Sequence, residues 1–164
     1  MPETCAPRRP SSPTKSVPAA VAALASLLKE PPIRELFTRS GGVQLLAPLL
    51  RMQGMPVPNP QMLYDAVLCV WSLSFLPPAC HVMHKAGIAS GLVEIIKLAT
   101  KEKVLRVSLY AIKNLLLTEG LELDNDVVEL ELVKAVAAKS GCVRVGVLWV
   151  CTTAYDLFQE SVCR

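Results

Sequence analysis

Apolar residues recur every three or four positions along most of the chain, the spacing that places them on one face of an α-helix. Prolines and glycines separate these segments, because proline fits the first turn of a helix and glycine the position after its last turn. Val21, Leu24, Leu27 and Leu28 form one such stripe. The pattern predicts helices at residues 18–29, 33–39, 43–52, 61–76, 77–86, 88–99 and 101–117. We expect Thr100 to cap the last helix and Glu102 to favour its first turn.

These segments repeat as a short, a medium and a long helix. Residues 36–42 align with residues 82–88 at an offset of 46, and residues 71–76 align with residues 110–115 at an offset of 39. Repeats of about 40–47 residues with two or three helices are typical of armadillo and HEAT proteins. One repeat cannot bury both faces of its helices, so neighbouring repeats stack and share a core. We therefore predict an all-α, armadillo/HEAT-like, right-handed helical solenoid of about two to three repeats.

The two ends of the chain differ from this repeat pattern. Residues 1–16 are rich in proline, arginine, serine and threonine, without the apolar core of a secretory signal, and should form a disordered tail. The repeat domain should span residues 17–140, with residues 121–139 as a further helix pair. In the C-terminal tail, residues 141–164, apolar residues alternate from Val143 to Trp149 as in a strand. No apolar run reaches the roughly 18–20 residues that a membrane-spanning helix needs.

The composition narrows the class of protein. Hydrophobic residues make up 52% of the chain but aromatic residues only 5%, which favours packed helices over a β-sandwich. The net charge of +3 is spread along the chain, so nucleic acid is not expected as a partner. The 6 cysteines include no Cys-x-x-Cys pair, and a reducing compartment is the simplest interpretation.

Motifs for catalysis or metal binding are weak. Cys80, His81 and His84 form the one metal-like cluster, but zinc needs three or four ligands and no second pair lies at a fitting spacing. Asp124 and Asp126 resemble the start of a calcium loop that lacks the required glycine and final glutamate. No phosphate-binding loop and no Gly-x-Ser-x-Gly motif occur. We expect a protein without catalytic residues or a cofactor. The alternative is a metal-dependent hydrolase that uses Cys80, His81 and His84, and metal analysis of the purified protein would distinguish the two.

The predicted helix at residues 101–117 carries the best candidate for a binding site. It is apolar around most of its circumference, apart from one strip of Lys103, Arg106, Tyr110 and Lys113. In armadillo repeats the third helix lines the concave groove, so this strip should face a partner, although a solvated helix face would show the same pattern. Tyr64 and Trp71 could line the same groove one repeat earlier, with the core as the favoured place for Trp71. Asn114 should brace the neighbouring loop through hydrogen bonds.

Two segments carry a more specific likeness. Residues 61–75 read QMLYDAVLCVWSLSF, and residues 100–107 read TKEKVLRV, followed by Asn114-Leu115-Leu116. Both segments resemble the H subunit of the vacuolar-type proton ATPase (V-ATPase), and the likeness covers residues 19–117. The KEKVLRV string is its most specific part, since a general armadillo protein would match Trp71 and Asn114 but not that string.

The resemblance implies an armadillo-like solenoid followed by a second, smaller helical domain, which this sequence does not include. It implies a non-catalytic peripheral subunit on the cytosolic face of vacuolar or endosomal membranes, also found in the cytosol. Its partners would be other V-ATPase subunits: the ATP-hydrolysing sector, the peripheral stalk and the membrane sector. The alternative is a free armadillo adaptor that binds a peptide or a partner helix in its concave groove.

Overall fold

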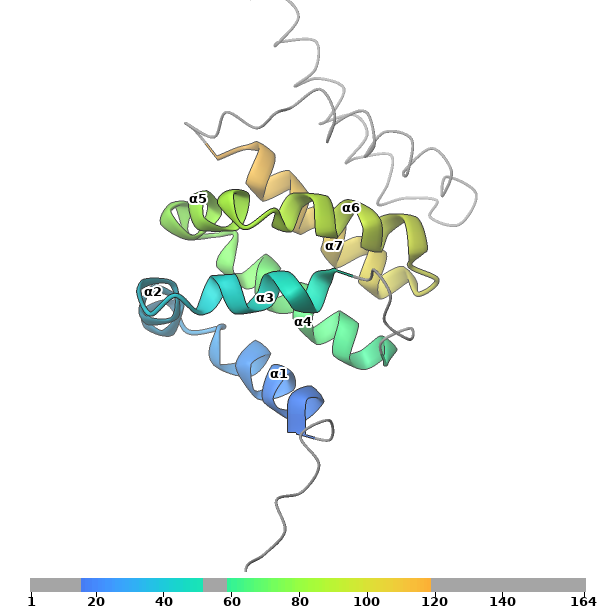
Figure 1. Cartoon of the computed structure of the whole chain (residues 1–164), viewed down its shortest axis with the longest axis horizontal. Coiled ribbons are helices and arrows are strands. Elements are labelled where there is room, and N and C mark those ends of the chain that lie inside the picture. The colour runs from blue at the N-terminus through green and yellow to red at the C-terminus, as the bar shows by residue number, and fades with distance from the viewer. Residues whose placement is uncertain (1–15, 52–58, 119–164) are drawn as a thin grey trace, which may run out of the picture.

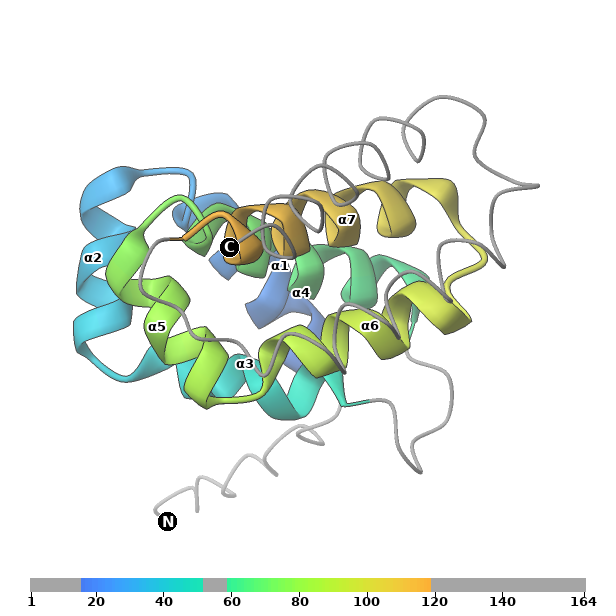
Figure 2. The same ribbon diagram turned by 90° about the horizontal axis from the view of Figure 1, so that it is seen from above.

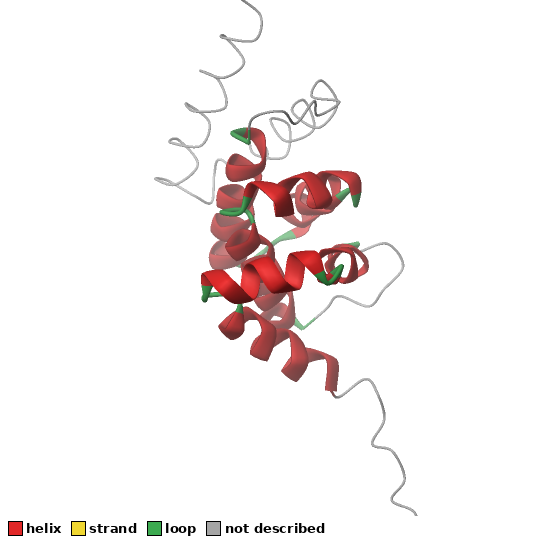
Figure 3. Ribbon diagram, turned by 90° about the vertical axis from the view of Figure 1, so that its left-hand side faces the viewer, coloured by secondary structure: helices red, strands yellow, loops and turns green. Residues whose placement is uncertain are grey.

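The computed structural model describes residues 16–51 and 59–118, and within these ranges the regular structure is entirely helical. The helices are α1 (Ser16–Leu27), α2 (Pro31–Arg39), α3 (Gly42–Leu50), α4 (Pro60–Leu73), α5 (Pro77–Lys85), α6 (Ile88–Leu98) and α7 (Glu102–Leu116) (Figure 1). Figure 3 shows only helices and short connections over the described residues. The predicted all-α fold is confirmed. The disordered tail, the helix pair at residues 121–139 and the strand at residues 143–149 lie outside the described residues.

Prolines and glycines set the helix boundaries as the sequence predicted. The helices α2, α4 and α5 each carry proline in the first turn, where no backbone N–H is needed for the helix. Gly41 and Gly87, which follow the short helices, have φ of 76° and 70°, a left-handed conformation that glycine adopts without strain. The predicted cap at Thr100 is wrong, since α7 begins after Lys101 and has no side-chain cap. Glu102 does stand in its first turn.

The helices stack in two layers. In Figure 1, α1, α4 and α7 follow one another from the bottom of the molecule to the top, behind α3 and α6. In this layer α4 packs against both α1 and α7. In the other layer α6 packs against α3 and α5 against α2. Figure 2 shows the same arrangement from above, with α2 and α5 together at one end of the molecule. This is the stacked geometry of a helical solenoid.

The repeat period differs between successive repeats. Pro31 and Pro77, the first residues of α2 and α5, are 46 positions apart, as the sequence predicted. The first residues of α4 and α7, Pro60 and Glu102, are 42 positions apart rather than the predicted 39. Because a helix turn takes 3.6 residues, an error of three positions keeps nearly the same face inward, so sequence similarity alone does not expose it.

One continuous core joins the helices. The most fully buried large side chains come from both layers of the stack; Leu28, Leu46, Leu73, Met83, Ile96 and Ile112 are among them. Leu27, which we placed on the buried stripe of α1, is instead 52% exposed. The stripe that packs into the core consists of Val21, Leu24, Ala25 and Leu28, so Ala25 takes the place that we predicted for Leu27. No helix among the described residues has both the length and the apolar character needed to cross a membrane.

Candidate protein-binding surface

The predicted strip on α7 lies on the outer side of that helix. Lys103, Arg106 and Tyr110 are exposed and Lys113 is half-buried. The opposite side of the helix is buried in the stack; it carries Val104, Leu105, Ser108, Leu109, Ala111, Ile112 and Leu115. The role of the strip in binding stays a prediction, but its orientation leaves it open to a partner.

At one end of the strip, Lys103 is engaged within the protein. Its Nζ lies 4.5 Å from the centre of the Tyr64 ring on α4, a cation–π contact. The same Nζ donates a hydrogen bond of 3.0 Å to Oε1 of Gln61. Gln61 Nε2 in turn donates to Oδ1 of Asp65 at 2.9 Å. The cation therefore ties α7 to α4, and the Tyr64 ring supports Lys103 from within the protein.

Arg106, the next residue of the strip, pairs with Glu102 one turn earlier on the same helix. Both side chains remain more than half exposed, at 55% and 57%. An exposed pair of this kind contributes little to stability, about 0.3–0.5 kcal/mol for residues four apart on a helix. Arg106 can therefore exchange Glu102 for an acidic group of a partner at small cost.

The other end of the surface is aromatic. The rings of Trp71 and Phe75 pack edge to face, with centroids 5.3 Å apart and planes at 68°. Phe75 is 56% exposed, Tyr110 38% and Leu117 47%, while Trp71 is half-buried. Trp71 is half-buried and packs against the core, the place favoured for it, while its position in a binding groove stays a prediction. Aromatic side chains with exposed faces are typical anchors at protein–protein interfaces.

A polar cluster places these aromatic groups on one surface. Asn114 Nδ2 on α7 donates a hydrogen bond of 2.8 Å to Oγ of Ser74, in the turn after α4. Ser74 Oγ donates to the carbonyl of Trp71 at 2.7 Å, and Cys80 Sγ donates to the carbonyl of Ser74 at 3.3 Å. The predicted brace by Asn114 is thus present. It holds α7 at Asn114, four positions after Tyr110, beside Ser74, which lies between Trp71 of α4 and Phe75 of the turn that follows.

Comparison with known proteins identifies the family. The family model that describes the H subunit of the V-ATPase matches residues 8–138. This chain belongs to the V-ATPase H-subunit family. It is 42% identical over 109 residues to the probable V-type proton ATPase H subunit of Oryza sativa subsp. japonica, covering 66% of this chain and 24% of that protein. It is 32% identical over 94 residues to the V-type proton ATPase H subunit of Dictyostelium discoideum, covering 57% of this chain and 21% of that protein.

This member of the H-subunit family therefore spans about a quarter or less of the length of these two relatives. The matched residues 8–138 include every described helix. The surface formed by α4 and α7 thus lies within the part of the chain that the family defines.

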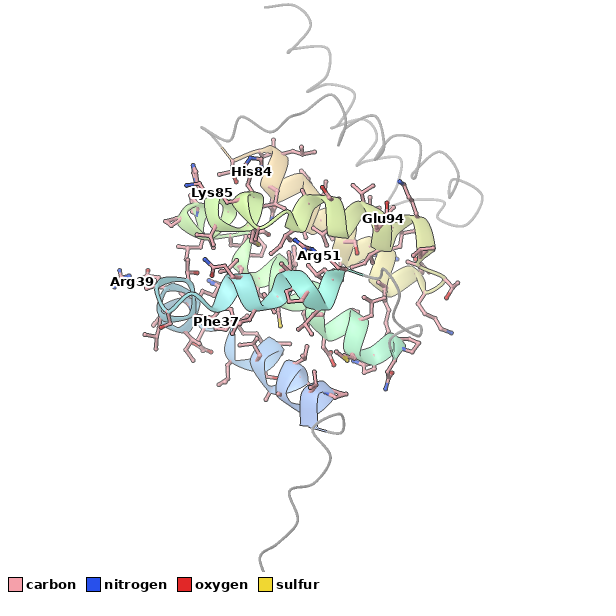
Figure 4. The ribbon with its side chains drawn as sticks, in the orientation of Figure 1. Phe37, Arg39, Arg51, His84, Lys85 and Glu94 are labelled. Atoms are coloured by element: carbon pink, nitrogen blue, oxygen red, sulfur yellow. The ribbon has the colours of Figure 1, made fainter. Side chains whose placement is uncertain are left out.

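The cysteine and histidine cluster of this chain is split by the fold. Cys80 is buried, and burial raises the pKa of its thiol, while a hydrogen bond with the Thr118 side chain lowers it. His81 is exposed, with Nδ1 2.9 Å from the carbonyl of Pro77. His84 lies near the C-terminal end of α5 (Figure 4). The described residues hold no group of three or more histidine, cysteine or acidic side chains suited to a metal ion.

Sequence reasoning missed three residues that shape the surface: Gln61, Ser74 and Phe75. Gln61 and Ser74 gain their roles from α7, whose partner residues lie 42 and 40 positions further along the chain. No local pattern reveals such a pairing. The period of the predicted helix at residues 61–76 could have found Phe75, four positions after Trp71, although the structure places Phe75 in the turn after α4.

Proposed function

We propose that this chain is a non-catalytic, peripheral subunit of the vacuolar-type proton-transporting ATPase, or the part of one that carries its contact surface. It acts by protein–protein contact between the ATP-hydrolysing sector, the stalk and the membrane sector, and so serves regulation and coupling. Membership of the V-ATPase H-subunit family supports this most directly. The place of action is the cytoplasmic face of vacuolar or endosomal membranes, with a cytosolic pool.

The α4–α7 surface is the contact site in this proposal. Its members are Lys103, Arg106, Tyr110 and Lys113 on α7, with Tyr64, Trp71 and Phe75 from α4 and the turn that follows. Its two ends have different tasks. Tyr110, Trp71 and Phe75 provide the apolar area that anchors a partner, since binding energy concentrates in a few aromatic and arginine side chains. The cations favour an acidic partner and speed its approach.

The alternative is a free armadillo adaptor that uses the same surface for a peptide or a single partner helix. The exposed faces of Phe75 and Tyr110 support it, because a few apolar anchors are enough to hold one amphipathic helix. Both functions share the fold, so only the identity of the bound protein separates them.

Co-purification of the tagged full chain from cells with V-ATPase tests the proposal. We expect stalk and catalytic subunits to be recovered with the wild-type chain, and Tyr110→Glu combined with Phe75→Ser to lower recovery at least about tenfold, since anchor residues contribute about 2 kcal/mol or more each. Leu98→Glu is the control, because Leu98 is 55% exposed, like Phe75 at 56%, but lies on α6 rather than on the contact surface. Full recovery of the ATPase subunits with the double variant would refute the α4–α7 surface as the contact site. Recovery of other proteins without any ATPase subunit would favour the adaptor.

A further inference from the structure

The exposed strip of α7 has a counterpart on α4. Five residues along one side of α4 and the turn after it are exposed or half-buried: Gln61, Tyr64, Leu68, Trp71 and Phe75. Each stands 42 positions before an exposed or half-buried residue at the end of the stack's next long helix: Lys103, Arg106, Tyr110, Lys113 and Leu117 in turn. The two strips therefore occupy the same side of two successive long helices.

This side belongs to the flank of the stack and not to one of its ends. The helix α4 lies between α1 and α7 and packs against both, yet its strip stays open (Figure 1). Near the start of the two helices Lys103 bonds to Gln61, and near their ends Asn114 bonds to Ser74. The helices α4 and α7 therefore run side by side in the same direction. Their strips form one surface about 21 Å long, at 1.5 Å per helical residue.

The two halves of this surface differ in charge. The α4 strip carries none, since Asp65, the charged residue of α4, is only 9% exposed. On the far side of α4, the helix α1 contains no charged residue, and the exposed Lys29 and Glu30 that follow it have opposite charges. The helix α7 carries three cations and one carboxylate, Glu102, which pairs with Arg106. A partner should therefore be apolar where it covers α4 and acidic where it covers α7.

The polar side chains of the surface favour a helix over an extended peptide. An extended segment that becomes buried needs new partners for its backbone N–H and C=O groups. The two carboxamide side chains here are already engaged within the protein. Gln61 accepts a hydrogen bond from Lys103 and donates one to Asp65, and the Asn114 amide donates to Ser74. A helix does not need such partners, because it pairs its backbone groups internally.

We propose that the α4–α7 surface binds one amphipathic helix of about four turns, the length that matches its span at 1.5 Å per residue. This inference rests on the proposed function, which makes the surface a contact site. The apolar side of the partner helix covers Leu68, Trp71 and Phe75, with anchors three, four and seven positions apart. Glutamate or aspartate along the adjoining side of the partner reaches Arg106 and replaces Glu102 there.

Charge reversal in the full chain, purified from cells with V-ATPase, tests the acidic side of the partner. Arg106→Glu should lower recovery of the bound partner at least about tenfold, because like charges then meet across the contact. Arg106→Lys keeps the cation and should retain most of the binding. Arg51→Glu, at an exposed arginine after α3, is the control with the same change in net charge and should bind like the wild-type chain. Equal recovery with Arg106→Glu and Arg51→Glu would overturn the acidic side.

Photo-cross-linking of the full chain in the same cells tests the shape of the partner. Tyr110→p-benzoylphenylalanine and Phe75→p-benzoylphenylalanine each put a reactive ketone in place of an exposed aromatic ring. Mass spectrometry then locates the labelled residues of the partner. We expect them to lie three, four and seven positions apart, in a segment that carries carboxylates. Leu98→p-benzoylphenylalanine, at a 55% exposed leucine of α6, is the control and should not label that segment.

The outcomes of cross-linking separate this inference from the proposed function. Labelled residues two positions apart in an ATPase subunit would indicate an extended segment, which overturns the helix and leaves the function standing. A labelled acidic helix in a protein outside the ATPase would support the helix and overturn the function. Labels within residues 119–164 of the chain itself, or no label from either position, would overturn the inference.

Discussion

The ammonium of Lys103 on α7 lies 4.5 Å from the centre of the Tyr64 ring on α4, which makes a residue of the expected contact strip part of the scaffold. Its hydrogen bond to Gln61 adds a second tie between the same two helices. A charge reversal at Lys103 would therefore disturb the helix pair that forms the surface as well as any contact with a partner. Tyr110 and Phe75 are better probes of binding, because their exposed faces have no such task.

Replacing Lys103 by methionine should destabilise the protein modestly. The change keeps the apolar stem over Tyr64 and removes the charge and the donor to Gln61. A cation–π contact at an exposed site is worth about 0.5–1 kcal/mol, and we expect the free energy of unfolding in urea to fall by about that amount. Lys29→Met, at an exposed lysine before α2, is the charge-matched control and should change stability far less. Equal effects of the two substitutions would show that the contact with Tyr64 contributes nothing.

Replacing Asn114 by alanine should lower the free energy of unfolding more than its place near the end of α7 suggests. Its side chain donates to Oγ of Ser74, which is only 6% exposed, so the buried hydroxyl loses its donor. We expect the free energy of unfolding to fall by about 1 kcal/mol, the usual net contribution of one such hydrogen bond. Asn114→Asp should be no better, because a carboxylate cannot donate. A variant as stable as wild type in urea unfolding would refute the bracing role.

Gly91 and Leu45 occupy equivalent repeat positions and should respond in opposite ways to substitution. Gly91→Leu forces a side chain into the joint with α3, where Cβ alone would lie 3.2 Å from Leu50. We expect a loss of about 1–3 kcal/mol in the free energy of unfolding, typical of an overpacked core. Leu45→Ala, at a 70% exposed site, should change the stability of the monomer by no more than about 0.5 kcal/mol. Thermal melts of the two variants make the comparison, and similar losses for both would contradict the repeat register.

The Cys69 thiol should make stability fall at high pH. Burial first, and the nearby carboxylate of Asp65 second, raise the pKa of Cys69 from its ordinary 9.0 to about 12. The unfolded chain therefore releases this proton near pH 9 while the folded chain retains it. Above pH 9 the free energy of unfolding should decrease by up to about 1.4 kcal/mol per pH unit for this thiol, until its folded pKa is reached.

Urea unfolding at pH 8 and pH 10 measures this slope. Cys69→Ala should lower stability at both values but reduce the difference between them. Cys80→Ala is the comparison variant, since it leaves the Cys69 contribution in place. An unchanged slope in Cys69→Ala would mean that another group titrates in this range.

Much of the fold could be predicted because helices are local. Proline in the first turn and glycine after the last one set boundaries within a few residues of the structure, as at Pro77 and Gly87. The cap at Thr100 could not be predicted so safely, because a cap depends on where the backbone turns, and α7 begins one residue later than a Thr100 cap requires. For the surface, the helical period separated Arg106 and Tyr110 from the apolar positions of α7, and both are exposed in the structure.

The pairing of the surface residues could not be predicted in the same way. Asn114 and Ser74 are separated by 40 positions, and their hydrogen bond depends on how α7 lies against α4. The same is true of Trp71, whose half-buried place depends on both the core beneath it and Phe75 beside it.

The sequence by itself determined that the chain forms a repeating series of helices, since periodicity, proline and glycine act over a few residues. The short strings in residues 61–75 and 100–107 also pointed to the family that the comparisons identify. Only the tertiary structure decided which apolar positions are covered. Leu27 and Leu73 are the same residue type at the same place in the repeat, yet one is 52% exposed and the other fully buried. Burial depends on what stacks above and below a helix, and α4 has α1 beside it, whereas the described structure places no helix beneath α1.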